Sequence, residues 1–303
     1  MGRLPHFIVI GAARSGTTTL YRGFKQHPQV FMSAIKETNF FAFEDEKLDV
    51  QGPGAEFINN SITKFDDYEA LFAAAPEGSI IGEASPLYLY VEKAPAGIAA
   101  RLPDARLLAV LRNPIEQAFS HYLYARANMI EPLESFDAAL DAEPERAARG
   151  WQPLFQYSSF PRYGEQIARF LRHFPREQIK IALFEDLEER PEQLMQEFQG
   201  FIGADTAFVP KLGHANPGGV PRNAALQRLV MQENLLTRTA ALLIPKQLRR
   251  RVRDRISSSN TVKPEMSRAA RARLTDALRD DVLLLQELIG VKLGSWLDPP
   301  KAA

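Results

Sequence analysis

The feature that most constrains the fold is a buried strand that runs directly into a glycine-containing loop and then into a helix. Residues 6–11, His-Phe-Ile-Val-Ile-Gly, form a short continuous apolar run, which is typical of a strand buried in a parallel sheet. The loop at 11–18 follows, and a helix is predicted from about Ser15 to Pro28. Such a corner directs backbone N–H groups and the positive end of a helix at an anion. The sequence therefore predicts an anion site near the start of the chain.

The rest of the chain continues the alternation of strands and helices. Three further apolar runs predict strands, at 79–82, 106–111 and 179–184. Each is followed by a helical pattern, at 91–102, 114–127 and 190–202. This alternation predicts a P-loop-like, three-layer α/β fold with a central parallel sheet and helices on both faces. Ligands of such sheets bind beyond the carboxyl ends of the strands.

The chain of 303 residues is expected to form a single domain. Its C-terminal part, 222–290, is predicted to be helical, with segments at 222–241, 245–257 and 267–290. Residues 42–67 are acidic and contain Gly and Pro, and residues 126–150 have the pattern of a helical insertion. We expect these two stretches to form loops or a lid on the substrate side of the site.

Charge and composition exclude several classes of function. There are 37 basic and 37 acidic residues, so the formal net charge is zero, which disfavours a nucleic-acid-binding surface but leaves room for a local anion site. The absence of cysteine excludes disulfides, thiol catalysis and Cys-based metal sites. No apolar run has the length of a membrane span, and residues 1–10 lack the pattern of a secretion signal. We therefore expect a cytoplasmic protein without an integral membrane segment.

The loop at 11–18 differs from that of the nucleotide triphosphatases. Gly11 and Gly16 have the spacing of the G-x-x-x-x-G-K-[ST] loop, but Thr17 stands where that loop has Lys. The cation is Arg14, inside the loop. Three hydroxyl groups accompany it, on Ser15, Thr17 and Thr18. Anion binding is strongly favoured over a purely structural turn, and a P-loop kinase that uses ATP is one alternative.

A second segment supports a related ligand. Leu-Arg-Asn-Pro at 111–114 ends a predicted strand, and Ser120 lies eight positions after Arg112 on the next helix. Together with the loop at 11–18, this segment resembles the PAPS-dependent sulfotransferases, PAPS being 3′-phosphoadenosine-5′-phosphosulfate. The resemblance implies that Arg112 and Ser120 bind the 3′-phosphate, which distinguishes PAPS from ATP. It also implies that the 5′-phosphosulfate is bound by Arg14, Ser15, Gly16, Thr17 and Thr18, with Arg14 stabilising the charge that develops as the sulfuryl group leaves.

The segment Lys36-Glu-Thr-Asn-Phe-Phe41 is similar to the Lys-Glu-x-x-Phe-Phe stretch of the heparan sulfate and related carbohydrate sulfotransferases. The resemblance implies that Glu37 is the general base for the acceptor hydroxyl and that Lys36 neutralises charge on the sulfate. The structural alternative is an exposed Lys–Glu pair on a loop.

Two other residues are candidates for the base. Residues 82–88, Gly-Glu-Ala-Ser-Pro-Leu-Tyr, resemble a segment of the carbohydrate-type and bacterial members. Within that segment, Glu83 is a second candidate base, a substrate ligand, or a residue that orients Arg14 or Lys36. His121 follows Ser120 on its helix and is the third candidate, although a helix His more often serves packing.

The C-terminal half carries weaker signals. Phe184 ends a predicted strand in the position of an aromatic residue near the adenine of the family, where it either stacks on the base or packs in the core. Residues 216–222 resemble a loop of bacterial members, and 257–263 lie where other members close a loop over the 3′-phosphate. The basic run at 246–255 is interpreted as a solvated helix face, with a contact for an anionic substrate or surface as the alternative.

These observations predict a bacterial sulfotransferase that moves a sulfuryl group from PAPS to a hydroxyl and releases PAP, with an amine as the less favoured acceptor group. The expected acceptor is a small molecule or glycan, namely a carbohydrate, glycolipid or natural product. We expect no metal, because Arg14 and Lys36 supply the charge. A catalytically inactive PAP-binding protein of the same fold is the second alternative. The sequence identifies neither the acceptor nor the oligomeric state.

Overall fold

The computed structural model describes residues 3–213, 220–221, 261–262 and 264–298. The helices expected at 222–241 and 245–257, and the basic run at 246–255, lie outside these residues, as do most of the segments at 216–222 and 257–263. The described parts of those two segments pair with each other, because β6 (Val220–Pro221) runs antiparallel to β7 (Thr261–Val262).

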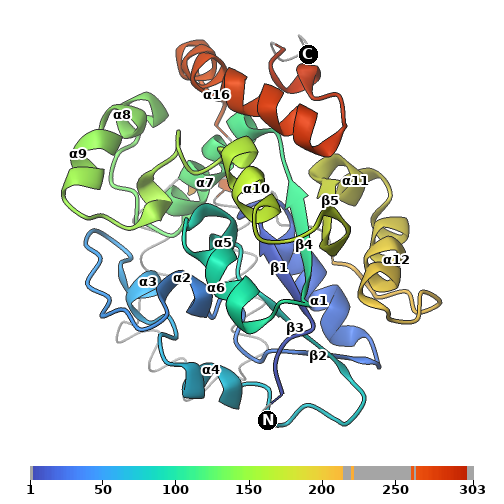
Figure 1. Cartoon of the computed structure of the whole chain (residues 1–303). Helices are drawn as coiled ribbons and strands as arrows, with labels where there is room; N and C mark the ends of the chain where they lie inside the picture. Colours follow the sequence, from blue (N-terminus) through green and yellow to red (C-terminus); the bar gives the residue numbers. More distant parts are fainter. Residues whose placement is uncertain (1–2, 214–219, 222–260, 263, 299–303) are drawn as a thin grey trace, which may run out of the picture.

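A five-stranded parallel sheet forms the centre of the fold, in the order β2-β3-β1-β4-β5 (Figure 1). Its strands are β1 (Phe7–Gly11), β2 (Val30–Met32), β3 (Ile80–Ala84), β4 (Arg106–Leu111) and β5 (Ile179–Leu183). The central strand places Ile8 opposite Glu83 on one side and Leu107 on the other. The sequence predicted four of these strands. The edge strand β2 was not predicted, because three residues are too few to show a pattern.

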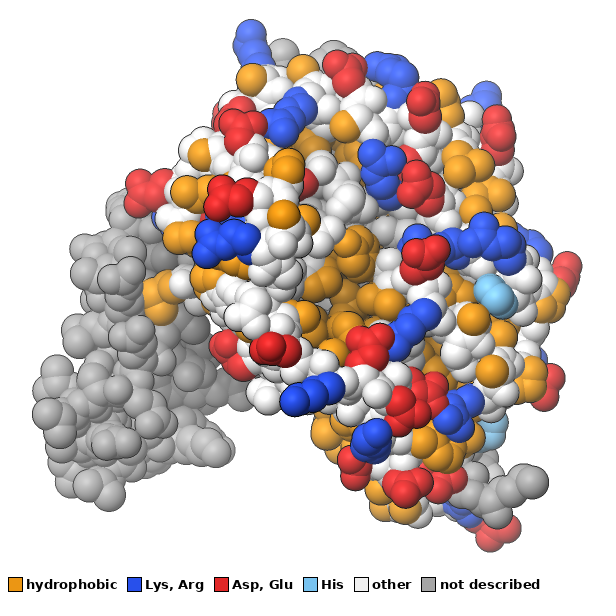
Figure 2. Space-filling view, turned by 60° about the vertical axis from the view of Figure 1, so that its left-hand side comes forward, with side chains coloured by type: hydrophobic (Ala, Val, Ile, Leu, Met, Phe, Trp, Pro, Cys, Tyr) orange, Lys and Arg blue, Asp and Glu red, His pale blue; other side chains and the backbone are white. Residues whose placement is uncertain are grey.

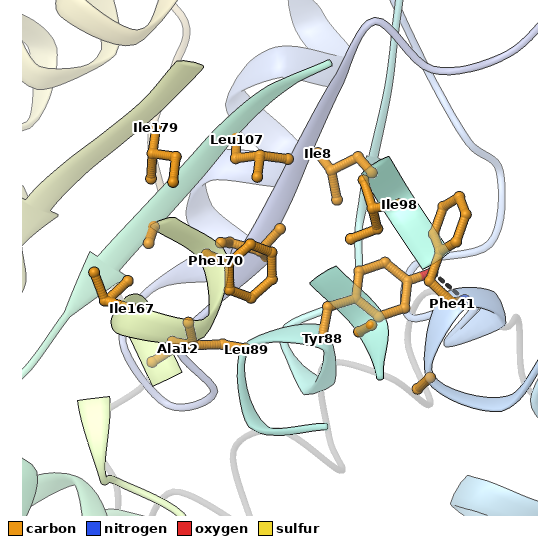
Figure 3. Close-up of a cluster of buried hydrophobic side chains, with 14 of the residues drawn as sticks. Ile8, Ala12, Phe41, Tyr88, Leu89, Ile98, Leu107, Ile167, Phe170 and Ile179 are labelled. Carbon is orange, nitrogen blue, oxygen red and sulfur yellow. Dashed lines mark hydrogen bonds between the residues drawn. The ribbon is translucent and has the colours of Figure 1, made fainter. Parts of the chain in front are cut away.

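Helices cover both faces of the sheet, and alternate residues of β1 serve the two cores. Ile8 and Ile10 belong to one core, and Phe7 and Val9 to the other. The first face is covered by α2 (Phe40–Phe43), α5 (Leu87–Tyr90), α6 (Ala94–Arg101), α10 (Tyr163–Leu171) and α16 (Arg268–Ile289). The second face is covered by α1 (Thr17–Gln26), α11 (Phe184–Glu189) and α12 (Pro191–Ile202). Figure 3 shows the first core, where Ile8 and Leu107 of the sheet lie near Phe170 of α10. The three-layer α/β prediction is confirmed.

The connections carry short helices. The stretch 42–67 holds the one-turn helix α3 (Glu56–Asn59) and leads into α4 (Phe65–Ala70). Residues 126–150 hold α8 (Phe136–Asp141) and α9 (Glu143–Ala148), and three-residue 3-10 helices lie at Pro153–Phe155 (η1), Arg176–Gln178 and Gly294–Trp296. Helix α7 (Pro114–Ala127) packs with α8 and α16 in a third hydrophobic cluster.

Two helix ends have well-defined caps. Asn113 caps α7, because its side chain accepts a hydrogen bond from the N–H of Ile115 at 3.0 Å. Helix α16 occupies the stretch predicted at 267–290 and ends at Gly290, whose φ of 70° is left-handed. Within the described ranges, every helix is too short or too polar to span a membrane.

Candidate active site

A cleft of about 1040 Å³ lies at the carboxyl ends of the strands. The segments that follow all five strands contribute to its lining, with Arg14 after β1, Lys36 after β2, Leu87 after β3, Arg112 after β4 and Phe184 after β5. A parallel sheet is expected to bind its ligand in this position. A second cavity of about 820 Å³ lies at the amino ends of the strands and contains none of the predicted site residues.

Most of the predicted site residues line the cleft, namely Arg14, Gly16, Thr17, Thr18, Lys36, Glu37, Arg112, Ser120, His121 and Phe184. Two others, Ser15 and Glu83, are fully buried and are not among the lining residues. The structure also separates the two stretches expected on the substrate side. Residues 56–58 and 60, within the stretch 42–67, line the cleft. No residue of 126–150 lines it, whereas residues 152–154, just beyond that stretch, do.

The loop after β1 is held in a tight turn. Arg14 and Gly16 have left-handed backbones, with φ of 64° and 88°. A Cβ on Gly16 would lie 2.2 Å from Cδ2 of Leu187. Any other residue at position 16 would therefore displace the Leu187 side chain, and it would also have a strained backbone at this φ. From α7, the Nε2 of Gln117 donates a hydrogen bond to the carbonyl of Ala13 at 3.1 Å. The amino end of α1 is therefore presented to the cleft by a loop that is fixed from both sides.

Polar atoms of this loop lack partners. Arg14 Nε and Ser15 Oγ are buried without a hydrogen-bond partner among the described residues. Buried polar groups are almost always paired, so the Nε of Arg14, a residue that lines the cleft, indicates a place for a ligand. Burial lowers the pKa of Arg14, and the nearby charge of Arg112 acts in the same direction. A bound anion would offset both effects.

Tyr124 belongs to the site and was not predicted from the sequence. The guanidinium carbon of Arg14 lies 4.6 Å from the centre of the Tyr124 ring. Burial raises the pKa of the Tyr124 phenol, and the charge of Glu37 adds to this rise. Tyr124 therefore neighbours both charged groups. A signal was present, because Tyr124 lies three and four positions after two predicted residues, His121 and Ser120, on one face of α7.

Lys36 and Glu37 form an ion pair at the cleft. Their side chains are 18% and 54% exposed. Glu37 has a left-handed backbone, with φ of 66°, and its N–H donates to the carbonyl of Ala84 at 2.9 Å. The ion pair named as the structural alternative therefore exists, and it faces the same space as the loop after β1.

Glu83 lies in the core instead of the cleft. Its carboxylate accepts hydrogen bonds from Thr38 at 2.7 Å, Tyr68 at 3.2 Å and Ser85 at 3.4 Å. Burial raises the pKa of Glu83 to about 7, although these hydroxyl groups oppose the rise. Because Thr38 follows Glu37 in the chain, Glu83 is placed to support the segment that carries Glu37.

His121 lines the cleft but is almost fully buried. Its ring meets that of Phe160 edge to face, with 4.7 Å between centroids. Burial lowers the pKa of His121 to about 3, and the charge of Arg14 adds to this effect. The imidazole is therefore neutral, and its Nδ1 has no hydrogen-bond partner among the described residues.

Arg112 and Phe184 lie together in the cleft, and a Cβ on Gly16 would lie 3.6 Å from Cε2 of Phe184. The guanidinium carbon of Arg112 is 4.9 Å from the centre of the Phe184 ring. Phe184 is the first residue of α11 and follows β5 directly, so the strand ends one residue earlier than predicted. Ser120 is in the second turn of α7, which begins two residues after Arg112.

Comparison with known proteins agrees with this geometry. A sequence profile of the "Sulfotransferase family" matches residues 5–207, about two thirds of the chain. The chain belongs to the sulfotransferase family. It is similar to the crystal structure of a sulfotransferase from Alicyclobacillus acidocaldarius, with 28% identity, a TM-score of 0.76 and coverage of 98% of this chain and 100% of that one. This match confirms the fold predicted from the sequence.

Curated relatives of this sulfotransferase are larger proteins. Human bifunctional heparan sulfate N-deacetylase/N-sulfotransferase 3 is 29% identical over 208 residues, which are 66% of this chain and 22% of that protein. Mouse heparan sulfate glucosamine 3-O-sulfotransferase 3A1 is 28% identical over 212 residues, which are 69% of this chain and 48% of that protein. The chain thus spans less than half the length of these two relatives. They confirm the resemblance that the segment at 36–41 indicated.

Proposed function

We propose that this member of the sulfotransferase family transfers a sulfuryl group from PAPS to a hydroxyl group of an acceptor and releases PAP. The observation that carries the proposal is the convergence of three motifs on one cleft. The loop at 11–18, the pair Lys36–Glu37, and Arg112 with Ser120 come from different strand ends and line the same space.

The donor fits the polar groups of the cleft. The 5′-phosphosulfate is assigned to residues 14–18, where Arg14 Nε is buried without a partner among the described residues and the amino end of α1 adds N–H groups. The 3′-phosphate is assigned to Arg112 and Ser120. Phe184, packed on Arg112, would flank the adenosine at the same end. Charge-assisted hydrogen bonds from the two arginines would hold both ends of the donor.

The reaction is an in-line displacement. The acceptor oxygen forms a bond to sulfur while the bond between sulfur and the 5′-phosphate oxygen breaks. The proton of the acceptor hydroxyl passes to the carboxylate of Glu37, and the charge that collects on the leaving phosphate faces Arg14 and Lys36. Positioning and charge stabilisation therefore provide most of the catalysis.

Glu37 is favoured as the base over the two other candidates. Glu83 does not line the cleft, so an acceptor has no direct contact with it. His121 lines the cleft, but its pKa of about 3 makes the imidazole a weak base. Geometry comes first in this choice, and Glu37 is exposed beside Lys36 where an acceptor can reach it.

We also propose that the chain forms one sulfotransferase domain that acts in the cytoplasm on a small-molecule or glycan acceptor and needs no metal. The contact between α10 and the C-terminal helix α16 supports a single domain, since the Asp281 carboxylate accepts a hydrogen bond from the Gly164 N–H at 2.9 Å.

The test is a screen of the purified protein with labelled PAPS against carbohydrates, glycolipids and hydroxylated natural products, in the presence of EDTA. We expect label in an acceptor and an equal amount of PAP. Magnesium-dependent turnover of ATP without affinity for PAP would overturn the proposal in favour of a kinase. Tight binding of PAP with no transfer in the whole screen would overturn it in favour of an inactive binding protein.

A further inference from the structure

The cleft has a second wall, beyond the base, whose chemistry differs from that of the donor groups. It consists of residues 56–58 and 60, residues 86–87, η1 with Gln152, and Phe160. We call this surface the acceptor wall. The face of the molecule that carries α3 comes forward in Figure 2, which shows a hollow lined by hydrophobic side chains and surrounded by charged ones.

Hydrogen bonds tie this wall to the segment that carries Glu37. The Nδ2 of Asn39 donates to Ser61 Oγ at 3.0 Å, and the N–H of Ile62 donates to the carbonyl of Thr38 at 2.9 Å. The end of α3 is therefore fixed beside the base. An acceptor whose hydroxyl reaches Glu37 can therefore lie against this wall, because none of the wall residues is among the groups assigned to the donor.

The remainder of the wall is held by aromatic contacts and loop contacts. The rings of Tyr90 and Phe160 stack at 4.6 Å with an interplanar angle of 7°, which joins α5 to the segment before α10. The Nε2 of Gln152 donates to the carbonyl of Pro53 at 2.6 Å, which joins η1 to the loop before α3. These contacts make the acceptor wall a preformed surface, as small-molecule sites generally are.

The acceptor wall is mostly apolar, with Glu56, Asn60 and Gln152 as its polar members. Its hydrophobic side chains are Phe57, Ile58, Leu87, Leu154 and Phe160, with two prolines, Pro86 and Pro153. Phe57 is 54% exposed, so its ring is accessible to a ligand. Within the described part of the wall, the one charged side chain is Glu56, which has the same sign as Glu37.

Two buried polar atoms belong to cleft residues outside the acceptor wall. Asn39 Oδ1 and His121 Nδ1 belong to residues that line the cleft and are 4% exposed, and both atoms lack a hydrogen-bond partner among the described residues. A mostly apolar surface with a few polar atoms is suited to an apolar molecule that carries a hydroxyl group. The polar atoms would orient that hydroxyl toward Glu37.

We propose, on the basis of the sulfuryl transfer inferred above, that the acceptor is a neutral and largely apolar alcohol or phenol, and not a polyanionic glycan. A polyanion on this wall would meet the carboxylate of Glu56, and it would lose hydration against apolar side chains without gaining a counter-charge from the described wall residues. A neutral aromatic or aliphatic alcohol buries apolar surface on the same wall and brings no repulsion.

The experiment compares a matched pair of probes by calorimetry with protein that is saturated with PAP. The probes are 2-naphthalenemethanol and its 6-carboxylate, which differ by one negative charge, and heparan sulfate is the polyanionic probe. We expect the neutral alcohol to bind at least about tenfold more tightly than the carboxylate, and heparan sulfate to bind more weakly still. Tighter binding of either anion, or no binding of the neutral alcohol, would overturn the proposal.

Variants locate the binding to the acceptor wall. Phe57→Ala should weaken binding of 2-naphthalenemethanol by about tenfold and leave the affinity for PAP unchanged. The matched control is Leu283→Ala, which removes an exposed apolar side chain from α16, 42% exposed and away from the cleft, and should change neither affinity. Equal binding to both variants would overturn the assignment of the wall. Failure of PAP to bind would instead overturn the proposed sulfuryl transfer, and this inference with it.

Discussion

The guanidinium of Arg14 lies on the ring of Tyr124, with its central carbon 4.6 Å from the ring centre. This contact joins the loop after β1 to the third turn of α7, so two neighbouring strand–helix units share it. A cation on an aromatic face contributes about 0.5–1 kcal/mol when exposed and about 2 kcal/mol when desolvated. The contact therefore restrains the one cation that the tight loop presents at its centre.

We expect Tyr124→Ala to lower turnover about tenfold or more, because Arg14 would lose the surface that fixes its orientation toward the sulfuryl group. Tyr124→Phe keeps the ring and should retain most of the activity. Steady-state kinetics of both variants, with thermal unfolding as a check on the fold, test this prediction. An equal loss in both would assign the effect to the Tyr124 hydroxyl.

Replacing the proposed base isolates its chemistry. We expect Glu37→Gln to lower kcat by roughly two to four orders of magnitude, because the amide cannot accept the proton of the acceptor hydroxyl. The affinity for PAP should be nearly unchanged, since Glu37 is not among the groups assigned to the phosphates. Single-turnover kinetics and PAP calorimetry measure the two quantities separately.

The matched control for this change is Glu145→Gln, which removes a carboxylate that is 75% exposed and paired with Arg149 on the surface. That variant should behave like the parent protein. Unchanged turnover in Glu37→Gln would move the base to His121 or to Glu83.

Glu83 gives a prediction about stability and pH. Burial raises the pKa of Glu83 from 4.5 to about 7 in the folded protein. The folded state therefore binds more protons than the unfolded chain between these values, so the free energy of unfolding falls as the pH rises through that window. At most, the loss is on the order of 3 kcal/mol, from about 1.4 kcal/mol per pH unit.

Glu83→Gln carries no titrating proton and should lack this loss. We expect the free energy of unfolding of Glu83→Gln, minus that of the parent protein, to increase as the pH rises from about 5 to about 8. Urea unfolding at each pH measures this difference. The exposed control Glu145→Gln should follow the parent protein throughout. A constant difference between Glu83→Gln and the parent protein would mean that Glu83 does not titrate in this range.

The fold was accessible from the sequence because its signals are local. The apolar run of β1 and the glycines of the loop at 11–18 each depend on neighbouring residues. The place of Glu83 was not accessible, because its partners Thr38 and Tyr68 lie 45 and 15 residues away and meet it only in the folded sheet. The motif at 82–88 therefore makes Glu83 a candidate base from the sequence. In the structure its carboxylate is buried and accepts hydrogen bonds from hydroxyl groups.

The same distinction between local signals and contacts formed only on folding applies to the residues of the cleft. Arg14 and Arg112 follow predicted strands, and parallel strands place their carboxyl ends at one edge, so the convergence of these two residues could be predicted. Tyr124 depends on the rotation of α7, and the acceptor wall depends on how η1 packs on the loop before α3. The i, i+3 and i, i+4 spacing from His121 and Ser120 places Tyr124 on the same face of α7, but no pattern in the sequence indicates the packing of η1 on that loop.

Arg112 gives a prediction that separates the two ends of the donor. Arg112→Ala should weaken binding of PAP by about tenfold or more, because a charge-assisted contact to the 3′-phosphate is lost. Adenosine 5′-monophosphate lacks that phosphate, so its affinity should be nearly the same for Arg112→Ala and the parent protein. Calorimetry with the two nucleotides measures both effects.

The Arg112 guanidinium also packs on Phe184, with 4.9 Å from the guanidinium carbon to the ring centre, so Phe184→Leu serves as the companion variant. It removes the aromatic face but leaves the charge, so it should weaken both nucleotides by a similar factor. A loss for adenosine 5′-monophosphate in Arg112→Ala as large as that for PAP would show that Arg112 acts through Phe184 and the adenosine, and would remove the 3′-phosphate from its assigned site.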